Sequence, residues 1–314
     1  MSKLNQIECV NNLKNTGFGT CVFDPKLIAG VLLFPTARTF TAEQLAEIEA
    51  TLRAAATADT KTERMFPLHQ FVGVTDNTED VIIQTFPYGK KAVVRDGDYD
   101  WTFQFTDGAL CLLTAAQTFN GNTPFLIYDK NNTIIGTTKD GLLSTIPPQF
   151  FYAMPWRVAT GDAVAQYMIR LVFNAQYINQ KLGFVPAGFD LSEIEGLKDV
   201  SIEENSFDDG TGVANVTVST LCNKTNLFTQ FSTELSDEDL WLATNKETGE
   251  EIVITSVAPV AGTKSFDVTF DTGDDNYPDA GGSILLTLAA PSVLSEADIE
   301  GYEAVELEIE IPAS

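Results

Sequence analysis

The sequence predicts a mostly β protein of two domains, an α+β domain followed by an all-β domain. Aromatic and polar residues alternate between Asp98 and Phe105, the pattern of a strand with one buried face. Beyond Lys198, short strand-like runs follow one another at near-regular intervals between turn residues. Charge also divides the chain, because residues 196–314 hold 24 acidic residues and 4 lysines, a net charge of −20 out of −25.

The domain boundary is expected where this composition changes. The segment from Gly188 to Lys198 leads into the acidic part, and all six arginines of the chain precede it. At 314 residues the chain is long enough for two cores. We therefore predict domains over residues 1–195 and 196–314.

In the first domain, one amphipathic helix is predicted over residues 42–56. Thr41 and Gln44 have the spacing of a capping box, and apolar residues recur at helical spacing at Leu45, Ile48, Leu52 and Ala55. A second, buried helix is expected from a cap at Asp107 to Thr118. Strands are predicted over residues 81–86, 91–95, 98–105, 124–128, 133–137 and 166–174, with 130–132 as a hairpin turn.

In the second domain, seven strands are predicted and almost no helix. They cover residues 200–203, 213–220, 240–244, 251–257, 265–270, 283–288 and 304–311. Seven short strands in about 115 residues match an immunoglobulin-like β-sandwich. Because the domain lacks the cysteine pair and tryptophan of antibody domains, only the general architecture is predicted.

Motifs for catalysis are absent from the sequence, and we predict a protein that is not an enzyme. His69 is the only histidine and has no nucleophile motif beside it, so a structural role is favoured over that of a general base. The cysteines Cys9, Cys21, Cys111 and Cys222 lie far apart and are interpreted as small buried apolar residues, not as zinc ligands. No cofactor is expected.

The acidic residues leave two interpretations open at one loop. Residues 271–282 carry several carboxylates on turns, which calcium prefers, but the loop lacks the EF-hand pattern and is also typical of a solvated hairpin tip. The overall negative charge argues against binding of nucleic acid or anionic membranes. A protein partner, or a polymer that must not adhere, is expected instead.

The segment from Phe86 to Asp98 is the candidate interface with a neighbouring subunit. It has glycines near both ends and three cations between them, and a long hairpin with unpaired edges favours pairing with another chain. The candidate residues are Tyr88, Gly89, Lys90, Lys91, Arg95 and Asp96. The alternative is an ordinary exposed hairpin.

The first domain resembles the tail tube proteins of long-tailed bacteriophages. The stretch that carries the resemblance runs from Phe71 to Phe86 and continues through Gly89, Val93, Gly97, Tyr99 and Trp101, followed by the helix near Leu110 and the strand from Tyr167 to Phe173. It covers residues 1–190.

The resemblance implies a β-sandwich or barrel of tail-tube type that forms six-membered rings, which stack into a hollow tube. DNA would pass through the tube without specific binding. The second domain resembles the immunoglobulin-like decorations of some virion proteins. Other tail proteins are further partners that the resemblance allows. The expected location is the virion tail, assembled in the host cytoplasm, since the first ten residues lack the apolar region of a secretion signal and no apolar run is long enough to span a membrane.

Other functions stay open. The helix at 42–56 fits a tail tube protein less well and leaves a head decoration or another virion protein as an alternative. A carbohydrate-binding module is a second alternative, which exposed aromatic residues on one face, such as Trp241, Tyr277 and Tyr302, would favour. A hydrolase would need a concave pocket with convergent acids.

Overall fold

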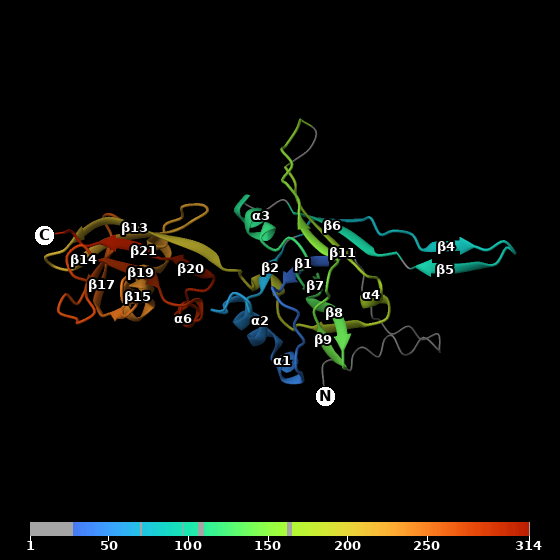
Figure 1. Cartoon of the computed structure of the whole chain (residues 1–314), viewed down its shortest axis with the longest axis horizontal. Coiled ribbons are helices and arrows are strands. Elements are labelled where there is room, and N and C mark those ends of the chain that lie inside the picture. The colour runs from blue at the N-terminus through green and yellow to red at the C-terminus, as the bar shows by residue number, and fades with distance from the viewer. Residues whose placement is uncertain (1–27, 70, 96, 106–109, 162–164, 314) are drawn as a thin grey trace. The chain divides into compact units, whose positions relative to one another are not determined.

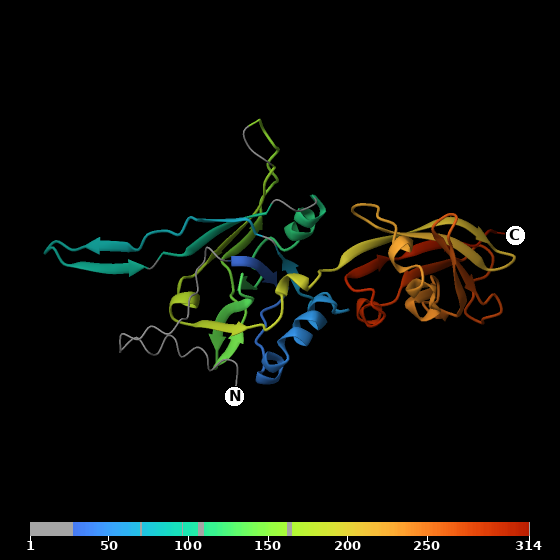
Figure 2. The same cartoon turned by 180° about the vertical axis from the view of Figure 1, so that it is seen from behind.

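The computed structural model describes residues 28–69, 71–95, 97–105, 110–161 and 165–313. The chain divides into two compact units between Glu195 and Gly196 (Figures 1 and 2). The net charge changes at this same boundary. The fold is mostly β, with 43% of residues in strands and 16% in helices, and its strands form several antiparallel sheets.

The first unit contains a six-stranded sheet. Its strand order is β12-β8-β7-β1-β2, with β9 paired to β8. The strands are β1 (Ile28–Leu33), β2 (Phe66–Leu68), β7 (Phe125–Asp129), β8 (Thr133–Lys139), β9 (Leu142–Ser144) and β12 (Leu182–Pro186). The predicted β7–β8 hairpin is confirmed, and Asp129 accepts hydrogen bonds from the backbone N–H groups of Asn131 and Thr133 within the turn.

A four-stranded antiparallel sheet packs on one face of this sheet. Its order is β10-β11-β6-β3, and its strands are β3 (Gly73–Asp76), β6 (Tyr99–Phe105), β10 (Phe150–Ala153) and β11 (Tyr167–Phe173). The alternation that predicted a strand over 98–105 is confirmed. Trp101, Phe103 and Phe105 are buried as predicted, but the prediction of a single buried face is wrong, because Asp100 and Thr102 on the other face of β6 are buried too and only Gln104 there is half-buried.

The six-stranded sheet is buried on both faces because its central strands are apolar at consecutive positions. On β1, Val31 and Leu33 join the core shared with the four-stranded sheet, whereas Leu32 between them belongs to a second core. That second core lies under two helices, α1 (Ala42–Ala46) and α2 (Ile48–Ala56). The first unit is therefore a layer of helices on a two-sheet stack (Figure 1).

The single helix predicted over 42–56 is wrong in its continuity. The capping box is confirmed, since Gln44 N–H donates to Thr41 Oγ1 and Thr41 N–H donates to Gln44 Oε1. The helix is interrupted at Glu47, whose φ and ψ are −114° and 49°. The Thr51 hydroxyl donates to the Gln44 carbonyl, the acceptor that a continuous helix would offer to residue 48.

The second predicted helix is α3 (Leu110–Gln117), and its predicted burial is wrong. Only Leu113 and Ala116 are buried, and Leu110 is 53% exposed. The helix packs through one narrow stripe of its surface, with Leu112 half-buried against the same core and Leu110 facing solvent. The predicted cap at Asp107 lies outside the described residues, and two shorter helical segments, α4 (Gln176–Asn179) and η3 (Leu191–Glu193), complete the unit.

The second unit consists of two sheets around one core. A five-stranded sheet has the order β17-β18-β14-β13-β20, and a four-stranded sheet has the order β16-β15-β19-β21. The strands are β13 (Lys198–Asp208), β14 (Val213–Thr220), β15 (Trp241–Asn245), β16 (Glu251–Ile252), β17 (Ile254–Val260), β18 (Ser265–Phe270), β19 (Ser283–Leu288), β20 (Tyr302–Val305) and β21 (Leu307–Glu310). Buried residues of both sheets, such as Val216, Phe266 and Leu286, form one cluster.

Two of the predicted strands of this unit each divide between the sheets. The run 251–257 becomes β16 in one sheet and β17 in the other, and 304–311 becomes β20 and β21. At the first crossing, Val253 N–H donates to Asp274 Oδ2, which holds the chain between the sheets. Helical segments that the sequence did not indicate also occur, at α5 (Phe228–Phe231), η4 (Glu234–Ser236), η5 (Glu238–Leu240) and α6 (Pro291–Glu296).

Candidate subunit interface

The candidate interface is a β-hairpin that projects from the first unit. Within the part of the chain that the structure describes, strands β4 (Ile82–Thr85) and β5 (Lys91–Arg95) pair only with each other. Their turn is closed by hydrogen bonds from Phe86 N–H to the Lys90 carbonyl and from Gly89 N–H to the Phe86 carbonyl. Gly89 has φ of +73°, which glycine adopts without strain. Figure 1 shows this hairpin extending away from both sheets of its unit, and we call residues 81–95 the arm.

The arm exposes apolar side chains on both of its faces. Those more than 40% exposed are Val81, Ile82, Ile83, Phe86, Tyr88, Val93 and Val94. Tyr88, at the turn, is 97% exposed. An isolated two-stranded hairpin is at best marginally stable in water. Contiguous exposed apolar surface of this kind marks an interaction site.

The base of the arm continues the four-stranded sheet. Asn77 N–H donates to the Asp100 carbonyl, and the Asn77 side-chain amide donates to the Thr102 hydroxyl. Gly97 lies so close to the segment that leads into β4 that a Cβ atom at residue 97 would lie 1.8 Å from the Glu79 carbonyl oxygen. Glycine is therefore required where the two segments that lead into the arm leave the four-stranded sheet.

The structure brings most of the predicted interface residues together at the end of the arm. Tyr88 and Gly89 form the turn, and the exposed Lys90 and Lys91 follow it. Arg95 ends β5, where its backbone pairs with Ile82. Asp96 lies outside the described residues.

Sequence reasoning missed the apolar part of this surface. Ile82, Ile83, Val93 and Val94 were predicted as strand residues, and a run of consecutive apolar residues normally indicates a strand buried on both faces. Nothing in the sequence signals that these strands leave the core.

A second exposed apolar surface begins on β10, the edge strand of the four-stranded sheet. Phe150 and Tyr152 on β10 point outward, at 37% and 43% exposure, while Phe151 and Ala153 between them are buried. The chain then projects as a second extension, residues 154–161 and 165–166, seen as the yellow-green loop at the top of Figure 1. Trp156 and Val158 on this extension are 45% and 64% exposed.

His69 occupies a structural site. It follows β2, its Nδ1 lies 2.6 Å from the Tyr128 hydroxyl, and its Nε2 lies 2.8 Å from the Ile194 carbonyl oxygen. Burial lowers the pKa of His69, although the Ile194 carbonyl and the carboxylates of Asp190 and Glu195 act in the opposite direction. With both nitrogens engaged by the protein, His69 ties β2 to β7 and to the end of the first unit.

The acidic loop at 271–282 uses its carboxylates to hold the backbone. Asp271 accepts from Gly273 N–H, and Asp274 accepts from Asn276 N–H and Val253 N–H, which lowers the pKa of Asp274. Within the described ranges, no group of three or more His, Cys, Asp or Glu side chains is placed to hold a metal ion.

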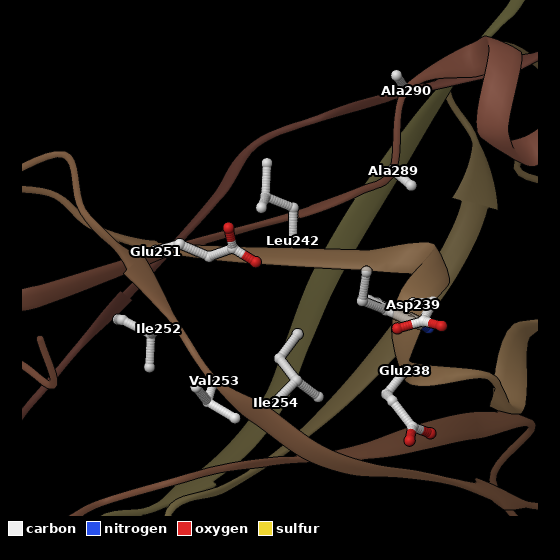
Figure 3. Close-up of a pocket in the computed structure, with 10 residues that line it drawn as sticks. Glu238, Asp239, Leu242, Glu251, Ile252, Val253, Ile254, Ala289 and Ala290 are labelled. Atoms are coloured by element: carbon white, nitrogen blue, oxygen red, sulfur yellow. The ribbon is translucent and has the colours of Figure 1, made fainter. Parts of the chain in front are cut away.

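The second unit has a groove where β16 leaves β15. The groove has a volume of about 400 Å³ and is lined by apolar residues of β15, β16, β17 and the β19–α6 connection, with Glu238, Asp239 and Glu251 at its rim. Figure 3 shows Leu242 and Ile254 between the carboxylate of Glu251 at one end and those of Asp239 and Glu238 at the other. All three acids are exposed.

The aromatic face expected of a carbohydrate-binding module is not formed. Trp241 and Tyr302 are core residues, 5% and 8% exposed, and Trp241 Nε1 donates to the Leu235 carbonyl at 2.9 Å. Tyr277 is half-buried against the same core. The prediction that the cysteines are buried is wrong for Cys111 and Cys222, which are exposed, while Cys9 and Cys21 lie outside the described residues.

No protein-family model and no curated protein matches this chain. Among the helices described here, none combines the length and the apolar character needed to cross a membrane.

Proposed function

We propose that this protein is a structural subunit of a bacteriophage virion, the tail tube protein that forms stacked rings around a channel for DNA. The observation that carries the proposal is the arm, a projecting hairpin with seven exposed apolar side chains. In a monomer this apolar surface would stay exposed to water, whereas in a repeating subunit a neighbouring copy covers it.

Open sheet edges support the same function. In the described part of the first unit, β3 is the last strand of the four-stranded sheet and leads directly into the arm. Its outward edge offers backbone groups to a strand of another copy. The opposite edge, at β10, is partly blocked, because Gly121 and Phe151 exchange backbone hydrogen bonds. The β3 edge of the four-stranded sheet is thus available for a head-to-tail contact between copies. Such contacts close into a ring when a whole number of identical rotations completes 360°.

The charge of the chain suits a channel for DNA. At a net charge of −25, few cations are present to displace counterions from phosphate, so DNA passes without being held. The second unit, with a net charge of −20, adds an immunoglobulin-like module that keeps particles apart by repulsion. In this function the protein is not an enzyme, and its partners are copies of itself in six-membered rings and other tail proteins.

Negative-stain microscopy of the purified full chain tests the proposal. We expect rings and hollow filaments that grow in number with protein concentration. A variant in which Ile82–Arg95 is replaced by Asn-Gly keeps both cores and is expected to stay monomeric, with unchanged thermal unfolding of the cores. Closed particles that never stack would favour the alternative of a head decoration, and a monomer at every concentration would contradict both.

A further inference from the structure

The arm is chemically distinct from the rest of the chain. Residues 81–95 contain three cations, Lys90, Lys91 and Arg95, and no acidic residue, in a chain with a net charge of −25. Lys90 and Lys91 are exposed, and neither forms an ion pair within the described residues. The surface that covers the arm must therefore offer both apolar contact and negative charge.

The groove of the second unit offers both. Leu242 and Val253 on its apolar lining are 38% and 53% exposed, and the rim carries three carboxylates. Two ion pairs of this unit, Lys224 with Glu203 and Lys246 with Glu308, involve other acids. Among the residues that the structure describes, the rim carboxylates have no cation as a partner.

We infer that the tip of the arm of one copy docks in the acidic groove of the second unit of another copy, with Tyr88 against the apolar lining and Lys90 and Lys91 beside the rim carboxylates. This inference rests on the proposed function and names the surface that receives the arm. Tyrosine buries a large area for little conformational entropy, and a cavity of about 400 Å³ lies within the size range of specific sites. The charges steer the arm toward the groove, and the contact of Tyr88 with the exposed Leu242 and Val253 adds to the affinity.

Charge reversal with rescue tests the inference on the full chain. One variant carries Lys90→Glu and Lys91→Glu, a second carries Glu238→Lys, Asp239→Lys and Glu251→Lys, and a third carries all five changes. The control reverses three exposed acids of the same unit outside the groove, Glu247, Glu306 and Glu310, and so matches the second variant in net charge. The concentration at which half of the protein sediments as assemblies is measured for each.

We expect each of the first two variants to need at least roughly tenfold more protein for assembly, as like charges replace a complementary pair of surfaces. The chain with all five changes recovers most of this loss, and the control assembles within about threefold of the natural chain. If the arm variant loses assembly while the groove variant assembles as the control does, the inference is overturned but the proposed function stands. If the natural chain never assembles, the proposed function itself fails.

A second measurement avoids charge changes in the groove altogether. A photoreactive benzoylphenylalanine at position 88 is expected to form crosslinks between copies, with the crosslinked peptide drawn from residues 238–254. Crosslinks that map to the first unit alone would place the arm elsewhere and overturn the inference.

Discussion

Asp100 on β6 and Arg170 on β11 form a two-point ion pair on the outer face of the four-stranded sheet. Arg170 Nε donates to Asp100 Oδ1 at 2.8 Å, and Arg170 Nη2 donates to Asp100 Oδ2. The guanidinium also lies over the Phe150 ring, 5.8 Å from its centroid. The Asp100 side chain is only 11% exposed, so its carboxylate is largely buried. The ion pair lies at the base of the arm, because Asn77 N–H donates to the carbonyl of the same Asp100.

Arg170→Ala is expected to lower the free energy of unfolding by about 1–3 kcal/mol, because it leaves a largely buried carboxylate without its cation. Chemical denaturation measures this loss. The double variant Asp100→Leu, Arg170→Met removes both charges and is expected to be less destabilised than Arg170→Ala. Equal losses in the two variants would show that the arginine contributes by packing alone.

Gly97→Ala is expected to displace the base of the arm, since the added Cβ would overlap the Glu79 carbonyl oxygen. The arm should become cleavable by a protease under native conditions, and assembly should weaken. Gly161→Ala is the matched control, because nothing lies within 4 Å of a Cβ placed there. Unchanged protease resistance in Gly97→Ala would mean that the segments containing Glu79 and Gly97 can move apart without destabilising the arm.

Trp241→Phe is expected to cost the second unit about 1–3 kcal/mol, because the Leu235 carbonyl loses its hydrogen-bond donor in a buried setting. The measurement is the denaturation midpoint followed by circular dichroism. Trp156→Phe is the control, since Trp156 is 45% exposed and a change there should stay within about 0.5 kcal/mol.

The sequence predicted best those elements whose apolar residues recur with a period that fits only one type of secondary structure. Trp101, Phe103 and Phe105 alternate with polar residues, so β6 follows from period alone. The run Ile28–Leu33 has no period and no strand is predicted there, although it forms the interior strand β1 of the six-stranded sheet. Strands buried on both faces carry no alternation to detect.

The interface was only partly predictable for a related reason. Ile82 and Val93 have the same side-chain chemistry as the buried Ile127 and Val31, yet they lie on the arm. Their exposure follows from the path of the chain beyond Asn77 and Gly97, which local residue types do not encode. The groove is likewise a product of the crossing at Val253, where one predicted strand becomes two.

His69 predicts how the stability of the first unit depends on pH. Burial makes the folded-state pKa of His69 lower than the ordinary value of 6.5, so the folded protein holds this residue neutral. Well above pH 6.5 the residue is neutral in both states, and the Tyr128 and Ile194 contacts contribute fully. As the pH falls below 6.5, only the unfolded chain takes up the proton, and the free energy of unfolding decreases until the folded-state pKa is reached.

The variant His69→Gln separates this effect from the titration of carboxylates. Gln keeps a polar side chain near Tyr128 and Ile194 but does not titrate, so the variant should lose about 1–2 kcal/mol at pH 7.5 and show a shallower decline between pH 6.5 and 5. Urea denaturation at several pH values measures both quantities. Parallel declines in the two proteins would mean that His69 takes up its proton equally in both states, and then Asp190 and Glu195, the acids that face it, fully offset its burial.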